Sequence, residues 1–349
     1  MDSLKRKFLW KPKGYEALEE SSSSVEISPV ESLLEYKLIT IQNATKNFSE
    51  ANRLGGGILG PVYKGKLKNG IQVAVKRLKK YEGRAQEFQN AVTLIASVQH
   101  NNFVRLLGYC CQEGGESILV YEFCPNGNLE NFLFDPVKRG YLDWGRRYKI
   151  IERIGKGLVF LHEDTRLHRN LNARNILLDE DLNPKIKNFH MARFALDKDY
   201  IGYEFGSKTV RYEAPEYVLR CELSVKSDVY SLGVLILEII SGQRFDRPLA
   251  SSEDHFAYLS CYVWIEWSKG SSLNVIDPML TGISSPLDDI IKCIQVALLC
   301  VQGNAKDRPT MGEVVQMLSN LSSVSLPIPS APLHLSIERR IPVSKMKNL

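Results

Sequence analysis

Hydrophobic and polar residues alternate in one part of the chain and recur with helical spacing in most of the rest. The segment VYKGKLKNGIQVAVKRL, residues 62–78, is typical of two strands joined at Asn69-Gly70, a dipeptide favoured in tight hairpins. In the segment 84–98, Phe88, Val92 and Ile95 recur at the spacing of one helix face. Residues 36–122 are therefore predicted to form a small sheet with one helix.

Long helical patterns take over beyond residue 126. We expect helices over residues 143–162, 226–241, 286–302 and 311–321. The segment 226–241 is apolar on almost every side, which predicts a helix buried in the middle of its surroundings. A chain of 349 residues with this organisation suits either two small domains or one two-lobed unit with tails.

The two ends of the chain lack this patterning, and we expect both to be flexible tails. Residues 1–35 are basic at first and then rich in serine, whereas residues 323–349 contain several prolines. A second interpretation of the first tail is a weak peripheral contact with an anionic membrane. Phe8, Leu9 and Trp10 would insert there while the neighbouring cations lie near the headgroups.

Composition is that of a soluble globular protein, with 44% hydrophobic and 24% charged residues. The net charge of +5 is mild and the basic residues are spread among acidic ones, which argues against nucleic-acid binding. No apolar run is long enough to span a membrane and no signal-peptide pattern follows Met1. We therefore expect a cytoplasmic protein, with the periphery of the plasma membrane as the alternative location.

The cysteines add a statement about redox environment. There are seven, an odd number, and most lie inside apolar runs. This favours buried thiols in a reducing compartment over disulfides, and no Cys/His set has zinc-binding spacing.

A glycine-rich segment carries the first sign of chemistry. The sequence LGGGILGPVYKG places Gly55, Gly57 and Gly60 in the spacing G-x-G-x-x-G-x-V, although glycines also serve ordinary tight turns. At the tip of a hairpin, such a segment can lie over phosphates and donate backbone N–H groups. Lys76 follows Gly60 by 16 residues and shares a strand face with Ala74. This combination predicts a phosphate site much more specifically than the glycines alone.

Further motifs carry a resemblance to a known family. The segments NATKNFSEANRLG, VAVKRL, LVYEFCPNGNL, APEY, KSDVYSLGVLILEIISG and RPTM follow one another along the chain. Together they resemble the intracellular part of plant receptor-like Ser/Thr protein kinases of the cysteine-rich receptor-like group. The resemblance covers residues 36–322 and implies an α+β, two-lobed protein-kinase fold. The N-lobe would span about 36–122 and the helical C-lobe about 126–322.

The resemblance also implies a site for ATP between the lobes. Lys76 would contact the phosphates, and the three glycines would cover them. The residues expected around the adenine offer apolar surface or backbone hydrogen bonds: Val62, Ala74, Tyr121, Glu122, Cys124 and Leu177.

Residues at the family's reactive positions depart from the pattern. Asn170 stands where the family has the catalytic aspartate, and an amide has no lone pair basic enough to accept a proton at neutral pH. General-base help is worth roughly 10²–10⁴ in rate. Asn172 replaces the lysine that steadies the transferring phosphoryl group. Both positions therefore count as degenerate catalytic residues.

The metal-binding positions are weakened as well. Asn188 stands where the family has the aspartate of Asp-Phe-Gly, and a hard cation prefers a carboxylate to a neutral amide. Asn175 is the one metal ligand of the family that is unchanged. Ala91 replaces the glutamate expected to pair with Lys76. The resemblance thus implies ATP as the cofactor, with Mg²⁺ bound weakly or not at all.

Residues that organise the fold are retained. Asp228 is expected to hold the backbone of the loop around Arg169, and Glu216 to form a buried ion pair with Arg308. Ser207 and Thr209 are candidate acceptors of a phosphate from another kinase, which Arg169 would then bind; any exposed Ser or Thr fits the same description.

Three hypotheses follow from this pattern of losses. The first is a pseudokinase that regulates another receptor-like kinase or signalling protein through its surface. The second is a weakly active or atypical Ser/Thr kinase that uses Lys76, the glycines and Asn175. The third is a nucleotide sensor that binds ATP with little metal.

Overall fold

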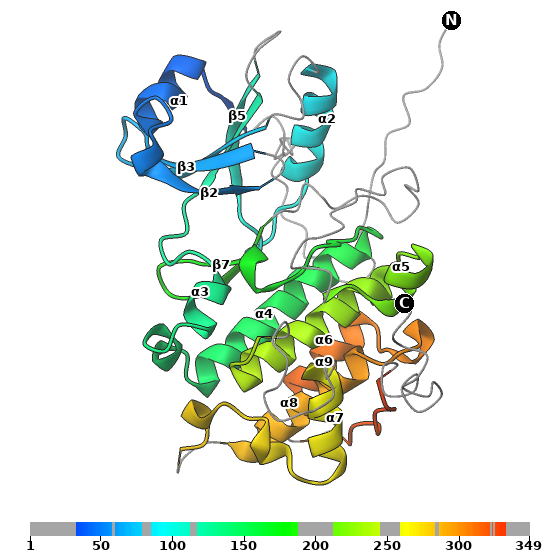
Figure 1. Cartoon of the computed structure of the whole chain (residues 1–349). Helices are drawn as coiled ribbons and strands as arrows, with labels where there is room; N and C mark the ends of the chain where they lie inside the picture. The colour runs from blue at the N-terminus through cyan, green and yellow to red at the C-terminus, as the bar shows by residue number, and fades with distance from the viewer. Residues whose placement is uncertain are drawn as a thin grey trace, which may run out of the picture.

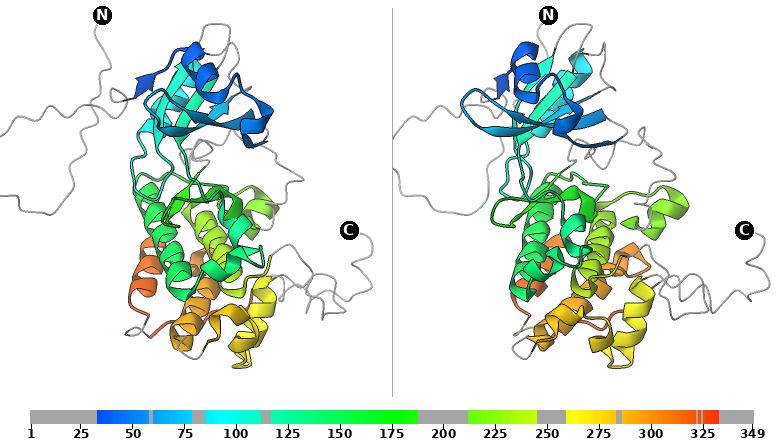
Figure 2. Two further views of the ribbon diagram at one scale, coloured as in Figure 1. Left: turned by 90° about the vertical axis from the view of Figure 1, so that its left-hand side faces the viewer. Right: turned by 60° about the vertical axis from the view of Figure 1, so that its left-hand side comes forward.

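The computed structural model describes residues 33–57, 60–78, 85–111, 117–187, 212–244, 259–282, 286–321, 323 and 325–332. Figure 1 shows a sheet-containing N-lobe above a larger helical C-lobe, and the views of Figure 2 keep the same division. This is the α+β, two-lobed architecture predicted from the sequence.

The N-lobe is built on one mixed sheet. Among the described residues its strand order is β1-β5-β6-β4-β3-β2, with β1 and β5 parallel and the other neighbours antiparallel. The strands are β1 (Leu34–Glu35), β2 (Arg53–Gly57), β3 (Gly60–Lys66), β4 (Gln72–Arg77), β5 (Leu106–Cys111) and β6 (Ser117–Glu122). The sheet therefore begins at Leu34, just inside the segment predicted as a tail.

The predicted hairpin is the β3–β4 pair. Gly70 adopts a φ of +86°, and the side chain of Asn69 accepts a hydrogen bond of 3.1 Å from the N–H of Ile71. Glycine adopts this left-handed conformation at little cost, which explains the tight turn. Val73 and Val75 are fully buried on one side of β4. The alternation seen in the sequence is thus the alternation of two sheet faces.

Two helices pack on the described part of this sheet, whereas the sequence pattern predicted one. Helix α2 (Ala85–Ala96) was expected, and it buries Phe88, Val92 and Ile95. Helix α1 (Leu38–Thr45) was missed because its buried stripe consists only of Ile41 and Thr45 and its N-cap makes no side-chain hydrogen bond. A stripe this short gives little helical periodicity.

The C-lobe is helical apart from a short hairpin. Its helices include the long segments predicted from the sequence, and α6 is buried along nearly its whole length. A capping box between Ser224 and Ser227 begins α6, and Gly242 ends it with a φ of +62°. The elements are α3 (Leu129–Leu133), α4 (Trp144–Glu163), β7 (Ile176–Leu178), β8 (Pro184–Ile186), α5 (Pro215–Arg220), α6 (Val225–Ser241), α7 (Leu259–Ser268), α8 (Leu287–Cys300) and α9 (Met311–Ser319).

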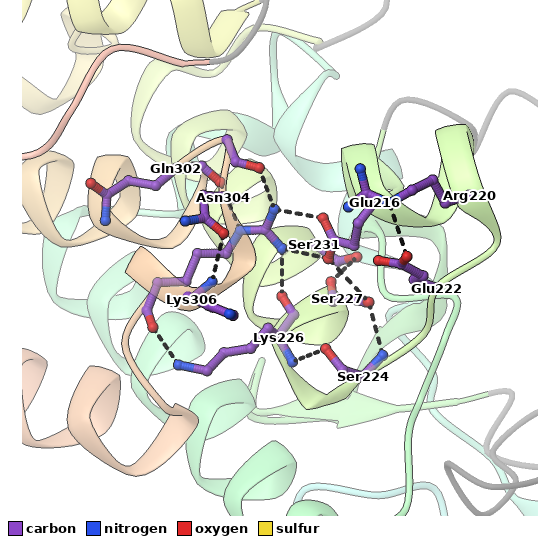
Figure 3. A network of polar contacts seen from close by, with 12 residues as sticks. Glu216, Arg220, Glu222, Ser224, Lys226, Ser227, Ser231, Gln302, Asn304 and Lys306 are labelled. Carbon is purple, nitrogen blue, oxygen red and sulfur yellow. Dashed lines mark hydrogen bonds and ion pairs between the residues drawn. The ribbon is translucent and has the colours of Figure 1, made fainter.

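A buried ion pair ties α5 to the segment before α9. The guanidinium of Arg308 donates to both carboxylate oxygens of Glu216, each at 2.8 Å, and also to the backbone oxygens of Gln302 and Lys226. Figure 3 shows the surrounding network, in which Glu216 faces Ser227 of α6. The predicted pairing of Glu216 with Arg308 is confirmed.

Part of the predicted C-terminal tail packs on the C-lobe. The indole of Trp264 on α7 donates to the oxygen of Pro329, and the amide of Gln295 on α8 donates to that of Pro327 at 2.7 Å. The N–H of Ser330 reaches the side chain of Gln302. Residues 325–332 therefore correct the prediction of a loose tail from 323 onward, because their backbone groups find partners on the lobe.

Two expectations from composition agree with the described residues. All seven cysteines are free thiols, and five of them are buried. No helix in the described part of the chain is both long and apolar enough to cross a membrane.

Candidate nucleotide-binding site

The glycines lie on two neighbouring strands at the edge of the N-lobe sheet. Gly57 of β2 pairs with Gly60 of β3, and Gly55 pairs with Val62. Gly55 and Gly60 have φ values of +149° and +129°, which residues other than glycine rarely adopt. The connecting residues 58 and 59 lie outside the described part of the chain. The strand context needed for the phosphate motif is present.

Lys76 lies on the central strand next to these glycines. It pairs in register with Val62, and Ala74 pairs with Tyr121 of β6. Ala74 and Lys76 share the sheet face opposite the buried valines, as predicted. Burial, together with the charge of Lys187, lowers the pKa of Lys76 from 10.5 to about 8.

The chain that connects the lobes begins at the end of β6. The carboxylate of Glu122 accepts a hydrogen bond of 2.8 Å from the N–H of Arg105 and one of 3.0 Å from the ammonium of Lys185 on β8. Cys124 is buried, and burial raises the pKa of its thiol to about 12, so the side chain is an uncharged thiol at neutral pH. Leu177 of β7 pairs with Lys185. These contacts bring the predicted adenine residues of both lobes to one region, which we call the interlobe site.

The loop from His168 to Asn175 forms the floor of the interlobe site. Asp228 of α6 accepts the N–H groups of His168 at 2.7 Å and Arg169 at 2.9 Å, and its carboxylate also contacts His162 at 3.0 Å. Burial opposes ionisation of Asp228, but these partners outweigh it and lower its pKa. Arg169 adopts a φ of +66°. A charged, buried carboxylate thus fixes the shape of the loop.

Three asparagines of this loop are joined by hydrogen bonds of their side chains to one another or to the loop backbone. The Nδ2 of Asn172 donates to the Oδ1 of Asn170 at 2.7 Å and to its backbone oxygen at 3.1 Å. The Oδ1 of Asn172 accepts the N–H groups of Arg174 and Asn175. The Nδ2 of Asn175 donates to the backbone oxygen of Asn170 at 2.7 Å. We call this set of neutral groups the amide cluster.

Comparison with known proteins agrees with the geometry. The sequence model of the family described as protein tyrosine and serine/threonine kinase matches residues 48–318. The chain belongs to this protein-kinase family. In Arabidopsis thaliana, it is 48% identical to cysteine-rich receptor-like protein kinase 19 over 304 residues, which are 86% of this chain and 46% of that protein. It is 46% identical to cysteine-rich receptor-like protein kinase 34 over 325 residues, 92% of this chain and 48% of the relative. The chain spans about half the length of these curated relatives.

Candidate ligands for a divalent metal ion are sparse in the described part of this protein-kinase domain. Among the described residues, no group of three or more His, Cys, Asp or Glu side chains is placed to hold a metal. Asn175 offers a neutral amide, and Asn188 lies outside the described residues. Hard divalent cations prefer carboxylate oxygens, so the neutral amide oxygen of Asn175 is a weaker ligand for Mg²⁺ than a carboxylate would be.

The regulatory positions of the kinase domain are only partly described. Ala91 lies on α2 and carries no group that could pair with a lysine. Arg169 lies in the loop held by Asp228. Ser207 and Thr209 lie outside the described residues. Phosphorylation of the latter two therefore stays a prediction from the sequence.

Sequence reasoning missed several charged residues near the floor of the site. Glu130 of α3 accepts from Arg174 at 2.7 Å and from Arg244 at 2.5 Å. Burial opposes ionisation of Glu130, but the two arginines outweigh it and lower its pKa. Lys187 was missed although it follows Ile186 directly. Its alternation with that buried residue was a signal that placed it on the face toward the N-lobe.

Proposed function

We propose that this protein-kinase domain is a pseudokinase: it keeps the nucleotide-binding frame, lacks efficient phosphoryl transfer and regulates a partner kinase. The amide cluster is the observation that carries the proposal. Asn170 and Asn172 satisfy each other and the loop backbone without any ionised group. These bonds hold the loop in shape, but Asn170 cannot act as a base and Asn172 brings no positive charge to the reaction.

Two separate contributions to transfer are affected. A general base has to accept the proton of the substrate hydroxyl, and the side chain of Asn170 is an amide whose oxygen already accepts from Asn172. Charge on the transferring phosphoryl group has to be stabilised, and Asn172 brings no positive charge to that place. Losses in independent contributions multiply in the rate, which supports impairment more strongly than either substitution alone.

The proposed partner is another receptor-like kinase or signalling protein. Relatives that are 46–48% identical carry the name of cysteine-rich receptor-like protein kinases, and the present chain matches about half of their length. We propose that the impaired domain pairs with an active member of this family. We place this pairing at the cytoplasmic side of the plasma membrane, with the basic residues 1–13 as a peripheral contact.

A second candidate function is weak Ser/Thr kinase activity. It is favoured by one observation: Asp228 holds the loop backbone at His168 and Arg169 with short hydrogen bonds, so the frame for transfer is intact. Positioning alone supplies part of the catalysis of phosphoryl transfer. The two candidates differ in whether ATP is consumed.

Transfer of labelled γ-phosphate separates them. We expect the purified chain to label neither itself nor a generic protein substrate, with Mg²⁺ or with Mn²⁺. The variant Lys76→Met controls for contaminating kinases, because it removes the phosphate-contacting lysine. Labelling by the natural chain that disappears in Lys76→Met would overturn the pseudokinase proposal. The revertant Asn170→Asp with Asn188→Asp is expected to stay inactive, since Ala91 and Asn172 remain.

A further inference from the structure

A proline-rich segment packs along α7 and α8 at the end of the C-lobe that lies away from the N-lobe (Figure 1). Residues 325–332 have the sequence SLPIPSAP. Proline fixes its own φ, and the residue before a proline is restricted to extended backbone. The three prolines therefore restrict every residue from Leu326 to Pro332 except Ser330. This favours polyproline II, an extended left-handed helix with three residues per turn.

Burial along the segment repeats with the same period of three. Pro329 and Pro332 are buried, and Leu326 is half-buried against the C-lobe core. Between these positions Pro327 is exposed, and Ile328 is 83% exposed. Every third residue thus anchors the segment, as expected for a polyproline II helix that lies on a surface.

Side chains of α7 and α8 bind the backbone of the segment. The Nε2 of Gln295 donates to the oxygens of Leu326 at 3.3 Å and Pro327 at 2.7 Å. The indole of Trp264 donates to the oxygen of Pro329 at 3.5 Å. A proline has no N–H, so carbonyl oxygens are the main polar groups that such a segment offers. Aromatic rings with polar donors beside them are the usual means of recognising proline-rich segments.

Gln302 binds the segment at its residue with least restricted backbone. The Oε1 of Gln302 accepts a hydrogen bond of 3.1 Å from the N–H of Ser330. Gln302 is buried, and its Nε2 donates to the backbone oxygens of Leu299 at 3.3 Å and Asp307 at 2.6 Å. These two bonds fix the amide so that its oxygen faces the segment.

The two glutamines have the spacing that an extended segment needs. Gln302 follows Gln295 by seven positions, which is about 10 Å along a helix. Ser330 follows Pro327 by three positions, which is about 9 Å in polyproline II. The segment therefore runs alongside α8 with its polar groups in step with the two side chains.

We propose that the face of α7 and α8 at Trp264, Gln295 and Gln302 recognises segments of the pattern Leu-Pro-x-Pro-x-x-Pro, and that a partner protein carrying this pattern takes the place of residues 325–332. We call this face the proline site. The chain's own segment shows which ligand chemistry the site accepts, namely an apolar anchor at every third residue and carbonyl oxygens along the backbone. The inference goes beyond the proposed function, because the interlobe site lies at the other end of the C-lobe (Figure 1).

The attachment of the segment allows exchange. Its hydrogen bonds described above go to three side chains, and four of its residues stay exposed: Ser325, Pro327, Ile328 and Ser330. Segments with few buried contacts open at a lower free energy than core helices do. A tethered segment has a high effective concentration at its site, so a partner that replaces it has to make a second contact with the domain.

Fluorescence anisotropy with the labelled peptide SLPIPSAP tests the proposal on the full chain. Pro329→Glu puts a charge at a buried anchor and should release the chain's own segment. We expect this variant to bind the peptide about ten-fold or more tightly than the natural chain, in which the tethered segment competes. Ile328→Glu adds the same charge at the exposed neighbouring position and should bind as the natural chain does.

Pro332→Glu opens the site at the other buried proline and should repeat the result. Equal binding by Pro329→Glu and Ile328→Glu would overturn the proposal, as would failure of both opened variants to bind the peptide. Melting temperatures of all three variants should stay close to that of the natural chain, because the core helices are unchanged.

Altered peptides show which features of the ligand the opened variant Pro329→Glu recognises. The peptide ALPAPAAP, which keeps only the pattern, should bind within about three-fold of SLPIPSAP, since the exposed positions carry no anchor. Alanine in place of the second proline should weaken binding about ten-fold, the size expected for two buried methylene groups. Alanine in place of the exposed first proline should have an effect of less than about three-fold. Failure of ALPAPAAP to bind would overturn recognition of the pattern.

A second substitution in the opened variant tests the polar contacts. Gln295→Ala removes the donor to two carbonyl oxygens and should weaken peptide binding about five-fold or more. Gln316→Ala on the exposed side of α9 is the matched control and should leave binding unchanged. Equal affinities of these two double variants would contradict the proposed site.

Light scattering distinguishes a partner protein from a second copy of this chain. We expect the mass of one chain at all concentrations, whereas a dimer formed by exchange of residues 325–332 would overturn the proposal of a separate partner. Phosphate transfer by the natural chain would overturn the pseudokinase proposal and leave the proline site standing. Absence of peptide binding would have the opposite consequence.

Discussion

The C-lobe buries polar groups in two opposite ways. The Glu216–Arg308 pair buries opposite charges together, whereas the amide cluster buries neutral groups. In the first, two opposite charges meet with both hydrogen bonds at 2.8 Å, and remaining donors reach backbone oxygens. In the second, positions where the family has charges carry amides that bond with one another. The fold therefore tolerates neutral side chains at the positions that serve the reaction in the family. It retains charged side chains at the positions that serve packing.

The strongest test of this contrast removes one half of the ion pair. Arg308→Met would leave the Glu216 carboxylate buried without its partner, and loss of one member of a buried pair costs about 3–5 kcal/mol. We expect a large fall in the free energy of unfolding, measured with urea. Arg220→Met, which removes the exposed pair with Glu222, is the matched control and should change stability by less than about 1 kcal/mol. Equal effects of the two variants would contradict the contrast.

A pH titration of stability examines the like charges of the interlobe site. The folded-state pKa of Lys76 is about 8 and its usual pKa is 10.5. Between these values the unfolded chain binds more protons than the folded one, so this group makes stability rise with pH by up to about 1.4 kcal/mol per unit. Below pH 8 both states are protonated and the unfavourable burial of the charge is fully present.

The variant Lys76→Met isolates this contribution from other groups that titrate in the same range. The difference in unfolding free energy between Lys76→Met and the natural chain should be largest below pH 8 and shrink toward pH 10.5. Lys187 contributes in the same direction, because burial and Arg174 lower its pKa, while Glu130 acts against them. A difference that does not vary with pH would show that Lys76 is not depressed in the folded state.

Charge returned to the amide cluster should have a smaller effect that depends on the position. In Asn172→Asp, a carboxylate would face the two Asn170 oxygens to which the Asn172 amide now donates, so we expect a loss of about 1–3 kcal/mol. In Asn170→Asp, the new carboxylate still accepts from Asn172, and stability should change by less than about 1 kcal/mol. Urea unfolding of both variants measures the difference. A reversed order would mean that the hydrogen bonds of the cluster are oriented differently.

Much of the fold was predictable because its patterns are long. The hairpin at Asn69-Gly70, the amphipathic α2 and the apolar α6 each follow from local spacing, and the structure confirms them. Helix α1 was not predictable because its buried stripe is short, and residues 325–332 were not predictable because distant helices hold them.

The candidate site divides in the same way. Motif spacing was sufficient to place Gly60 and Lys76 on neighbouring strands of the N-lobe sheet. It did not reveal that Asn172 bonds to Asn170, because side-chain pairing within a loop depends on its backbone conformation. Motif spacing also did not reveal that Lys187 of the C-lobe lies close enough to Lys76 of the N-lobe to lower its pKa.

The ion pair between Lys185 and Glu122 has a mechanical consequence. It joins a strand of the C-lobe to the last residue of the N-lobe sheet at the point where the two lobes connect. A rotation of one lobe about this contact would leave Glu122 nearly in place and displace most the residues that lie furthest from it. The glycine-rich strands β2 and β3 lie at one end of the sheet, so they are far from this contact and move more than β6 does. A small change of angle at the ion pair is therefore amplified where phosphates would be covered.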